Sequence, residues 1–267
     1  MALLDQLPEL LASPPAEGWQ STDFAGLDQL HIGGLAATKK LLAWLPASAH
    51  KGLDMGGGLG GCARMLALKH ACSMTVSDLD ESYIAAGRLL NDSLTPQPDC
   101  QYVTANSLQL PFAEQSFDFV LSQHAMMPIA DKQQVLSEAS RVVKAGGYLL
   151  LHEVYLAPQA NPDQVAYPTP WANEYAHSHL QTWLDFVQDC KEKGWQLVQT
   201  EDETQQSLAW ITKARANASK QSNPLNARLA LGPDAGRMSG NVMANLQNGM
   251  IEVRRALLKL GSDVNYI

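Results

Sequence analysis

Apolar and polar positions divide the chain into short segments of two kinds. Some segments are almost continuously apolar, which is typical of strands that a parallel sheet buries on both faces. Other segments repeat apolar residues every three or four positions, which is typical of amphipathic helices. The first kind predicts strands at 51–55, 73–78, 101–106, 117–123, 148–156 and 195–203.

The second kind falls between these strands. It predicts helices at 34–45, 60–71, 81–94, 131–143, 179–194, 207–218 and 238–250, after a short apolar helix at the N-terminus. Strands that alternate with helices predict an α/β fold with a doubly wound, mostly parallel Rossmann-like sheet and helices on both faces. The pattern assigns no single element to IEVRRALLKL (251–260).

The net charge of the chain indicates which classes of binding partner to expect. The 267-residue chain carries a formal net charge of −8, whereas nucleic acids and anionic membranes are bound through basic surfaces. We therefore expect no nucleic acid and no membrane as partner. No apolar run approaches the roughly 18 residues that span a bilayer, and the N-terminus lacks the basic region of a secretory signal. The expected location is cytoplasmic, where the four cysteines stay as thiols.

A glycine-rich turn follows the first predicted strand. In GLDMGGGLGG (52–61), Gly56, Gly58 and Gly61 match the G-x-G-x-x-G dinucleotide fingerprint. The same stretch contains D-x-G-x-G-x-G, formed by Asp54, Gly56, Gly58 and Gly60. Asp78, at the end of the second strand, can accept hydrogen bonds from a ribose in either case. The glycines alone therefore leave the cofactor open.

Asp54 separates the two cofactors. A carboxylate immediately before the glycines repels a pyrophosphate, and like-charge contact in a site of reduced dielectric costs several kcal/mol. The same carboxylate attracts the ammonium and sulfonium of S-adenosylmethionine. The alternative is that Asp54 only caps the following helix. The charge argument favours S-adenosylmethionine over a nicotinamide cofactor, so that an oxidoreductase is the weaker hypothesis.

Two further segments carry a resemblance to a known family. VTANSLQLPFAEQSFDFVLSQ (103–123) and LSEASRVVKAGGYLLLHE (136–153) resemble the class I S-adenosylmethionine-dependent methyltransferases. The resemblance runs from about residue 51 to 156. It implies an enzyme with S-adenosyl-L-methionine as cofactor, S-adenosyl-L-homocysteine as product and a small-molecule acceptor as partner.

The resemblance also implies roles for individual residues. Asp54 and the loop glycines surround the methionine part of the cofactor, Asp78 binds the ribose and Leu79 packs against adenine. Asn106 stands where the family usually has an acid for the adenine amino group, and its carbonyl can still accept a hydrogen bond. The implied cofactor-binding residues are Asp54, Gly56, Gly58, Gly60, Asp78, Leu79, Asn106, Ser107, Leu108 and Gln123.

The flanking segments narrow the family further. DQLHIGGLAATKKLL (28–42) resembles the lid of the methyltransferases of sarcosine/dimethylglycine, phosphoethanolamine and quinones, and AYPTPWANEYAHSHL (166–180) resembles their substrate-side loop. We therefore expect a single domain (1–267) with an N-terminal helical lid (1–50), a cofactor-binding core (51–156) and a substrate side with late strands and helices (157–267). The chain departs from its relatives at His124 and Pro128, two positions that face the acceptor.

The residues around the acceptor can be sorted by chemistry. Transfer to an amine requires mainly alignment, whereas transfer to oxygen or carbon requires a nearby base. The candidate catalytic residues are His124, Tyr155 and His31; the candidate substrate-binding residues are Gln29, Trp171 and Tyr175. His152, Tyr167, His177 and His179 are weaker candidates, and packing is the alternative role for each. His177 and His179 lack further ligands at a suitable spacing, so we expect no metal.

The leading prediction is N-methylation of a small amine. One alternative is O- or C-methylation of a small metabolite such as a quinone precursor, with His124 as the base. Another is a cofactor-binding subunit that has lost catalysis, which the substitutions Asn106 and Pro128 would permit. We expect a monomer or a homodimer.

Overall fold

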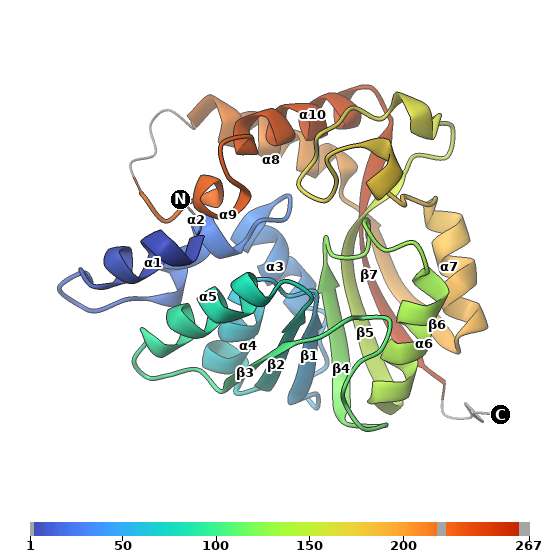
Figure 1. Ribbon diagram of the computed structural model, residues 1–267. Coiled ribbons are helices and arrows are strands. Elements are labelled where there is room, and N and C mark those ends of the chain that lie inside the picture. The colour runs from blue at the N-terminus through green and yellow to red at the C-terminus, as the bar shows by residue number, and fades with distance from the viewer. Residues whose placement is uncertain (1–2, 218–222, 262–267) are drawn as a thin grey trace.

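The computed structural model describes residues 3–217 and 223–261. A seven-stranded sheet lies at the centre of this part of the chain, in the order β3-β2-β1-β4-β5-β7-β6 (Figure 1). The strands are β1 (Lys51–Met55), β2 (Ser73–Asp78), β3 (Cys100–Thr104), β4 (Phe117–Gln123), β5 (Val143–Leu156), β6 (Trp195–Asp202) and β7 (Ile251–Leu260). The first five strands are parallel, and β7 runs antiparallel between β5 and β6.

Helices cover both faces of the sheet (Figure 1). The α-helices are α1 (Leu3–Leu11), α2 (Ala25–Asp28), α3 (Gly34–Leu42), α4 (Gly61–His70), α5 (Glu81–Asp92), α6 (Lys132–Val142), α7 (Trp183–Glu192), α8 (Thr204–Asn217), α9 (Ala227–Leu231) and α10 (Ala235–Gln247). Short 3₁₀ turns lie at Ser21–Phe24, Pro162–Gln164 and Tyr175–His177. The predicted doubly wound α/β fold is confirmed.

The apolar stripes of the helices explain the two main cores. On one face, α6 and α7 pack onto β1, β4 and β5 through side chains such as Leu136 and Phe186. On the other face, α3 and α4 pack through Leu41 and Leu66 onto Val76 of β2 and its neighbours. Each fully buried side chain of this kind contributes about 1.5–3 kcal/mol to folding. These two layers hold the carboxyl ends of the parallel strands at one edge.

Several boundaries differ from the sequence prediction. β5 begins at Val143, because this residue pairs with Phe117 of β4 directly after α6. α7 begins at Trp183 and not at 179, because the Thr182 side chain accepts a hydrogen bond from Asp185 N and caps the helix there. The predicted end of the next helix at residue 218 lies outside the described residues.

The segment that the pattern left open forms β7. Ile251–Leu260 pairs with β5 on one side and with β6 on the other. Most of its side chains are buried, which explains why its sequence shows no clean alternation of apolar and polar positions. β7 therefore joins the edge strand β6 to the parallel part of the sheet.

The N-terminal helices pack beside the glycine turn. Leu7 of α1 and Leu27 of α2 share an apolar cluster with Leu90 of α5. A buried ion pair joins α2 to α4, because Arg64 Nη2 lies 2.6 Å from Asp28 Oδ2. The role of this region as a lid, and the division of the chain at residues 50 and 156, stay predictions.

Candidate functional site

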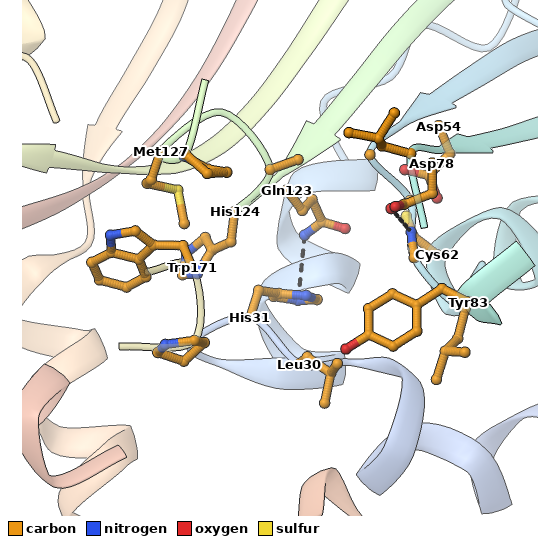
Figure 2. A pocket seen from close by; sticks show the side chains of 18 of the residues that line it. Leu30, His31, Asp54, Cys62, Asp78, Tyr83, Gln123, His124, Met127 and Trp171 are labelled. Carbon is orange, nitrogen blue, oxygen red and sulfur yellow. Dashed lines mark hydrogen bonds between the residues drawn. The ribbon is translucent and has the colours of Figure 1, made fainter. Parts of the chain in front are cut away.

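The carboxyl ends of β1, β2 and β4 border a cavity of about 370 Å³. Figure 2 shows two chemically different ends. Asp54, Cys62, Asp78 and Tyr83 lie on one side, which we call the carboxylate end. The other side, which we call the imidazole end, is formed by His31, Gln123, His124, Met127 and Trp171. Ligands of open α/β sheets bind at this edge.

Asp78 organises the carboxylate end. Its Oδ2 accepts a hydrogen bond from Gly58 N at 2.9 Å, and its Oδ1 accepts one from Asp80 N at 3.0 Å. Burial raises the pKa of this carboxyl above its usual value, although the two N–H groups oppose the shift. Gly58 adopts a positive φ of 54°, which glycine tolerates without strain. The turn thus fixes Asp78 at the rim of the cavity.

Asp54 lies deeper and is 3% exposed. Burial raises the pKa of Asp54 to about 7, and the neighbouring Asp78 carboxylate acts in the same direction. The backbone of Gly57 packs directly on this carboxyl: a Cβ at Gly57 would lie 2.6 Å from Asp54 Cγ. A bound cation next to Asp54 would favour its ionised form.

The outer part of the carboxylate end combines an exposed aliphatic side chain with two polar residues. Leu79 lines the cavity although its side chain is 72% exposed, which leaves an aliphatic surface for a planar group. Asn106 and Ser107 line the cavity beside it. Asn106 Oδ1 already accepts a hydrogen bond from Leu108 N at 2.9 Å; its second lone pair and its NH₂ group are available for a ligand.

The imidazole end is organised by Thr38 of α3, which is fully buried. Its hydroxyl donates to Gln29 Oε1 at 2.6 Å and lies 3.0 Å from His31 Nε2. His31 Nε2 is also 3.1 Å from the carbonyl oxygen of Gly34. The amide Nε2 of Gln123 lies 3.3 Å from the same ring nitrogen. Burial lowers the pKa of His31 to about 3, and His152 adds to the shift.

His124 differs from His31 because its Nε2 is buried and has no hydrogen-bond partner. Burial, followed by the neighbouring His152 and His31, lowers the pKa of His124 well below its usual value. The residue has a φ of +52°, a conformation that is strained for most residues and that clusters at functional sites. The imidazole is therefore neutral, and its buried Nε2 has no hydrogen-bond partner among the described residues.

The remaining lining of the imidazole end is apolar. Met127, Pro170 and Trp171 line the cavity, and Trp171 is held in place by a hydrogen bond from Nε1 to Ser178 Oγ at 3.0 Å. Among the residues that the structure describes, the cavity is lined by no Lys and no Arg. This end consequently offers no positive charge to a phosphate or carboxylate.

Most of the residues that the sequence proposed for the site line this one cavity. They are Gln29, His31, Asp54, Gly56, Gly58, Asp78, Leu79, Asn106, Ser107, Gln123, His124 and Trp171. Their contributions to binding and catalysis stay predictions.

Four proposed residues lie elsewhere. Tyr155 is 3% exposed and packs against Trp183 and Phe186, because its position on β5 faces α7. Leu108 packs against the same core. Tyr175 is 50% exposed in a 3₁₀ turn and does not line the cavity. Gly60 caps α4 beneath the Tyr102 ring, where a Cβ would lie 2.6 Å from the hydroxyl oxygen. The structure gives none of the four a contact with the cavity.

Two polar residues with no proposed role contribute to the site. Asp28 lines the cavity, and its Oδ1 is buried without a hydrogen-bond partner. Burial raises the pKa of Asp28 to about 6, although Arg64 opposes this shift. Thr38 connects Gln29, His31 and Gln123. Both residues lie in the segment that resembles a lid, but only the fold reveals their partners.

No helix in the described ranges is long and apolar enough to cross a membrane. Within residues 3–217 and 223–261, no group of three or more His, Cys, Asp or Glu side chains is placed to hold a metal ion.

Comparisons with known proteins agree with the geometry. Residues 53–151 match the family model described as a methyltransferase domain. The chain is 27% identical over 201 residues to a sarcosine/dimethylglycine N-methyltransferase from Halorhodospira halochloris, covering 74% of this chain and 67% of the relative. It is 32% identical over 120 residues to the ubiquinone/menaquinone biosynthesis C-methyltransferase UbiE from Roseobacter denitrificans, covering 44% and 48%. The chain spans about half the length of most of the curated relatives.

The fold is shared with solved structures as well. A provisionally assigned sarcosine dimethylglycine methyltransferase from Galdieria sulphuraria superposes with a TM-score of 0.72 at 20% identity, covering 86% of each chain. The predicted resemblance to methyltransferases is confirmed, and so is the predicted class of enzyme.

Proposed function

Because residues 53–151 match a methyltransferase domain and the chain resembles the S-adenosylmethionine-dependent methyltransferases, we propose that it methylates an oxygen or carbon of a small, uncharged acceptor. The single observation that carries this choice is His124, a neutral imidazole at the cavity whose Nε2 has no partner within the protein. An amine acceptor needs no such group. An acidic O–H or C–H group must lose its proton and therefore needs a base.

The carboxylate end fits the cofactor. Asp54 and Asp28 supply buried carboxyl oxygens for the ammonium and sulfonium groups, and Asp28 Oδ1 is without a partner. Asp78 is held at the rim for ribose hydroxyls, and the exposed face of Leu79 is suited to adenine. A phosphate-bearing cofactor would meet these same carboxylates and no cation from the described lining.

The imidazole end supports an uncharged acceptor. A carboxylate or phosphate on the acceptor would lose its hydration in the cavity without meeting Lys or Arg among the described lining residues. Trp171 and Met127 offer apolar contact area instead. Gln29, which is 7% exposed, also lines the cavity, and its Oε1 accepts a hydrogen bond from Thr38.

A labelled methyl donor tests the proposal directly. Purified protein is incubated with S-adenosylmethionine and a panel that pairs uncharged phenols, enols and quinols with sarcosine, dimethylglycine and phosphoethanolamine. We expect label on the uncharged O–H or C–H acceptors. Label only on the zwitterionic amines would overturn the proposal. Binding of S-adenosylhomocysteine without methylation of any acceptor would favour the cofactor-binding subunit without catalysis.

A second candidate is the amine N-methylation that the sequence favoured. Its support is the relative from Halorhodospira halochloris, whose alignment covers 74% of this chain. In this case His124 and Gln123 would only orient the amine. The variant His124→Asn would then keep most of its activity, which distinguishes the two candidates.

A further inference from the structure

A third imidazole lies directly behind the imidazole end of the cavity. His152, on β5, is 1% exposed and does not line the cavity. Its ring stacks on that of His124, with a centroid distance of 4.9 Å and an interplanar angle of 24°. It meets the His31 ring edge-on at 5.6 Å. His31, His124 and His152 therefore form one compact cluster, which we call the imidazole cluster.

A buried carboxylate stands behind this cluster. Glu203 follows β6 and is 3% exposed. Its Oε2 lies 3.4 Å from His152 Nε2, a nitrogen that has no aligned hydrogen-bond partner. Although burial alone would raise it, contacts with His152, Arg255 and Lys40 lower the pKa of Glu203 to about 2. Glu203 is therefore an anion at neutral pH.

The other charged side chains near His152 have partners of their own. Lys40 of α3 lies 3.2 Å from Glu203 Oε1, and Arg255 of β7 lies 3.6 Å from the same oxygen. Arg255 also pairs with Glu201 of β6. Glu153, the neighbour of His152 on β5, accepts hydrogen bonds from Ser122 Oγ and from the backbone N–H groups of residues 125 and 126. Glu203 is thus the anion in direct reach of the imidazole cluster.

We propose that Glu203 and His152 are positioning residues that make the imidazole cluster a single proton acceptor, with Glu203 as its counter-charge. The inference rests on the proposed function. S-adenosylmethionine supplies an electrophilic methyl group. As the acceptor oxygen or carbon attacks this group, the C–S bond breaks and its electron pair stays on sulfur. The acceptor proton moves to His124 Nε2 and leaves the cluster for water afterwards.

Glu203 stabilises the resulting positive charge through the His152 ring. In the dry interior, an opposite charge at this distance shifts an ionisation by about one pH unit or more. Because the three rings are coupled, the shift belongs to the cluster and is not a property of one ring. Removing the anion must therefore lower the pH at which the cluster takes up its first proton.

The test compares two variants that change the charge near the cluster in opposite directions. Glu203→Gln keeps the shape of the side chain and removes its negative charge. Lys40→Met is the matched control, because it removes a positive charge from the same carboxylate on a side chain that is 48% exposed. Ring signals of the histidines are followed by NMR against pH with S-adenosylhomocysteine bound, which requires no acceptor. We expect the cluster titration to move down by about one pH unit in Glu203→Gln and up by a smaller amount in Lys40→Met.

Kinetics supply the second readout. Glu203→Gln should lower kcat about 10-fold or more with little change in KM, and the acidic limb of its pH profile should move to lower pH. Affinity for S-adenosylhomocysteine should stay within about twofold of wild type in both variants, since neither residue lines the cavity.

The outcomes separate the two proposals. Unchanged histidine titrations in an active Glu203→Gln protein overturn the role of Glu203 alone. Loss of S-adenosylhomocysteine binding in Glu203→Gln indicates that Glu203 has a purely structural role, and this result also overturns the proposal for Glu203. A wild type that methylates no O–H or C–H acceptor, while the titrations shift as expected, overturns the proposed function instead.

Discussion

The two ends of the cavity differ in their electrostatics, since one carries carboxyl groups and the other carries neutral imidazoles. The carboxylate end, together with Asp28, brings three carboxyl groups to the cavity wall, which suits a ligand with a positive charge of its own. The imidazole end keeps His31 and His124 neutral by burial, so that one of them can receive charge during the reaction. Under the proposed function, this difference predicts that the first end determines affinity for the cofactor and that the second end changes its protonation during the reaction. Variants that change one end only can test this division.

The largest effect is expected at the imidazole end. His124→Asn removes the ring nitrogen but retains a residue type that tolerates the φ of +52°. We expect kcat for an O–H or C–H acceptor to fall about 10²–10⁴-fold, which is the usual contribution of a general base, with little loss of affinity for S-adenosylhomocysteine. Steady-state kinetics and calorimetry measure the two quantities. His177→Asn, on a side chain that is 67% exposed, is the control and should behave as wild type.

A second effect is expected at the carboxylate end alone. Asp78→Ala removes the acceptor of two backbone N–H groups in the glycine turn and the proposed ribose ligand. Affinity for S-adenosylhomocysteine should fall about 100-fold or more, because the turn loses its order and the ligand loses charge-assisted hydrogen bonds. Calorimetry measures the loss. Asp92→Ala, at the distant end of α5, should bind normally; undiminished affinity in Asp78→Ala would refute the assignment.

A smaller effect tests the packing of the glycine turn. Gly57→Ala places a Cβ 2.6–3.0 Å from the Asp54 carboxyl atoms, so the turn or the carboxyl must shift. We expect affinity for S-adenosylhomocysteine to fall about 10-fold. Gly236→Ala on α10 is the matched control, since its Cβ would meet nothing within 4 Å. Equal affinities in the two variants would show that the turn adapts without cost.

The smallest effect is a pH dependence. Because the pKa of Asp54 is raised to about 7, this carboxyl becomes ionised as pH rises from 6 to 8. S-adenosylhomocysteine carries an ammonium group, so its affinity should rise several-fold over this range, and Asp54→Asn should flatten the profile.

The stability of the ligand-free protein should change with pH in the opposite direction. A carboxyl whose folded pKa exceeds its unfolded value lowers stability as pH rises between about 4 and 7, which thermal unfolding measures.

The sequence predicted the carboxylate end better than the imidazole end for a physical reason. Asp54, Gly56 and Gly58 are neighbours in the chain, and Asp78 follows at the end of the next strand, so local pattern suffices to place them together. The imidazole cluster brings together His31, His124 and His152 from three distant segments. The sequence named His31 and His124 as candidates, but no local pattern indicates that the rings of the three residues meet.

Tyr155 illustrates the same limit. Its position on a strand end made it a plausible catalytic residue, but alternation along the strand decides which face a side chain reaches. Tyr155 faces Trp183 of α7, whereas His152 lies beneath His124. β7 could not be predicted from the sequence either, because burial of most of its side chains removes the apolar–polar alternation that marks an antiparallel strand.

β7 also sets an order of events during synthesis. It is the last strand in chain order, yet it pairs with β5 on one side and β6 on the other. It also fixes Glu203, whose backbone N donates to Val253 O at 2.8 Å. Glu203 therefore cannot be held beside His152 until residue 253 has left the ribosome, so the imidazole cluster gains its neighbouring carboxylate late in synthesis.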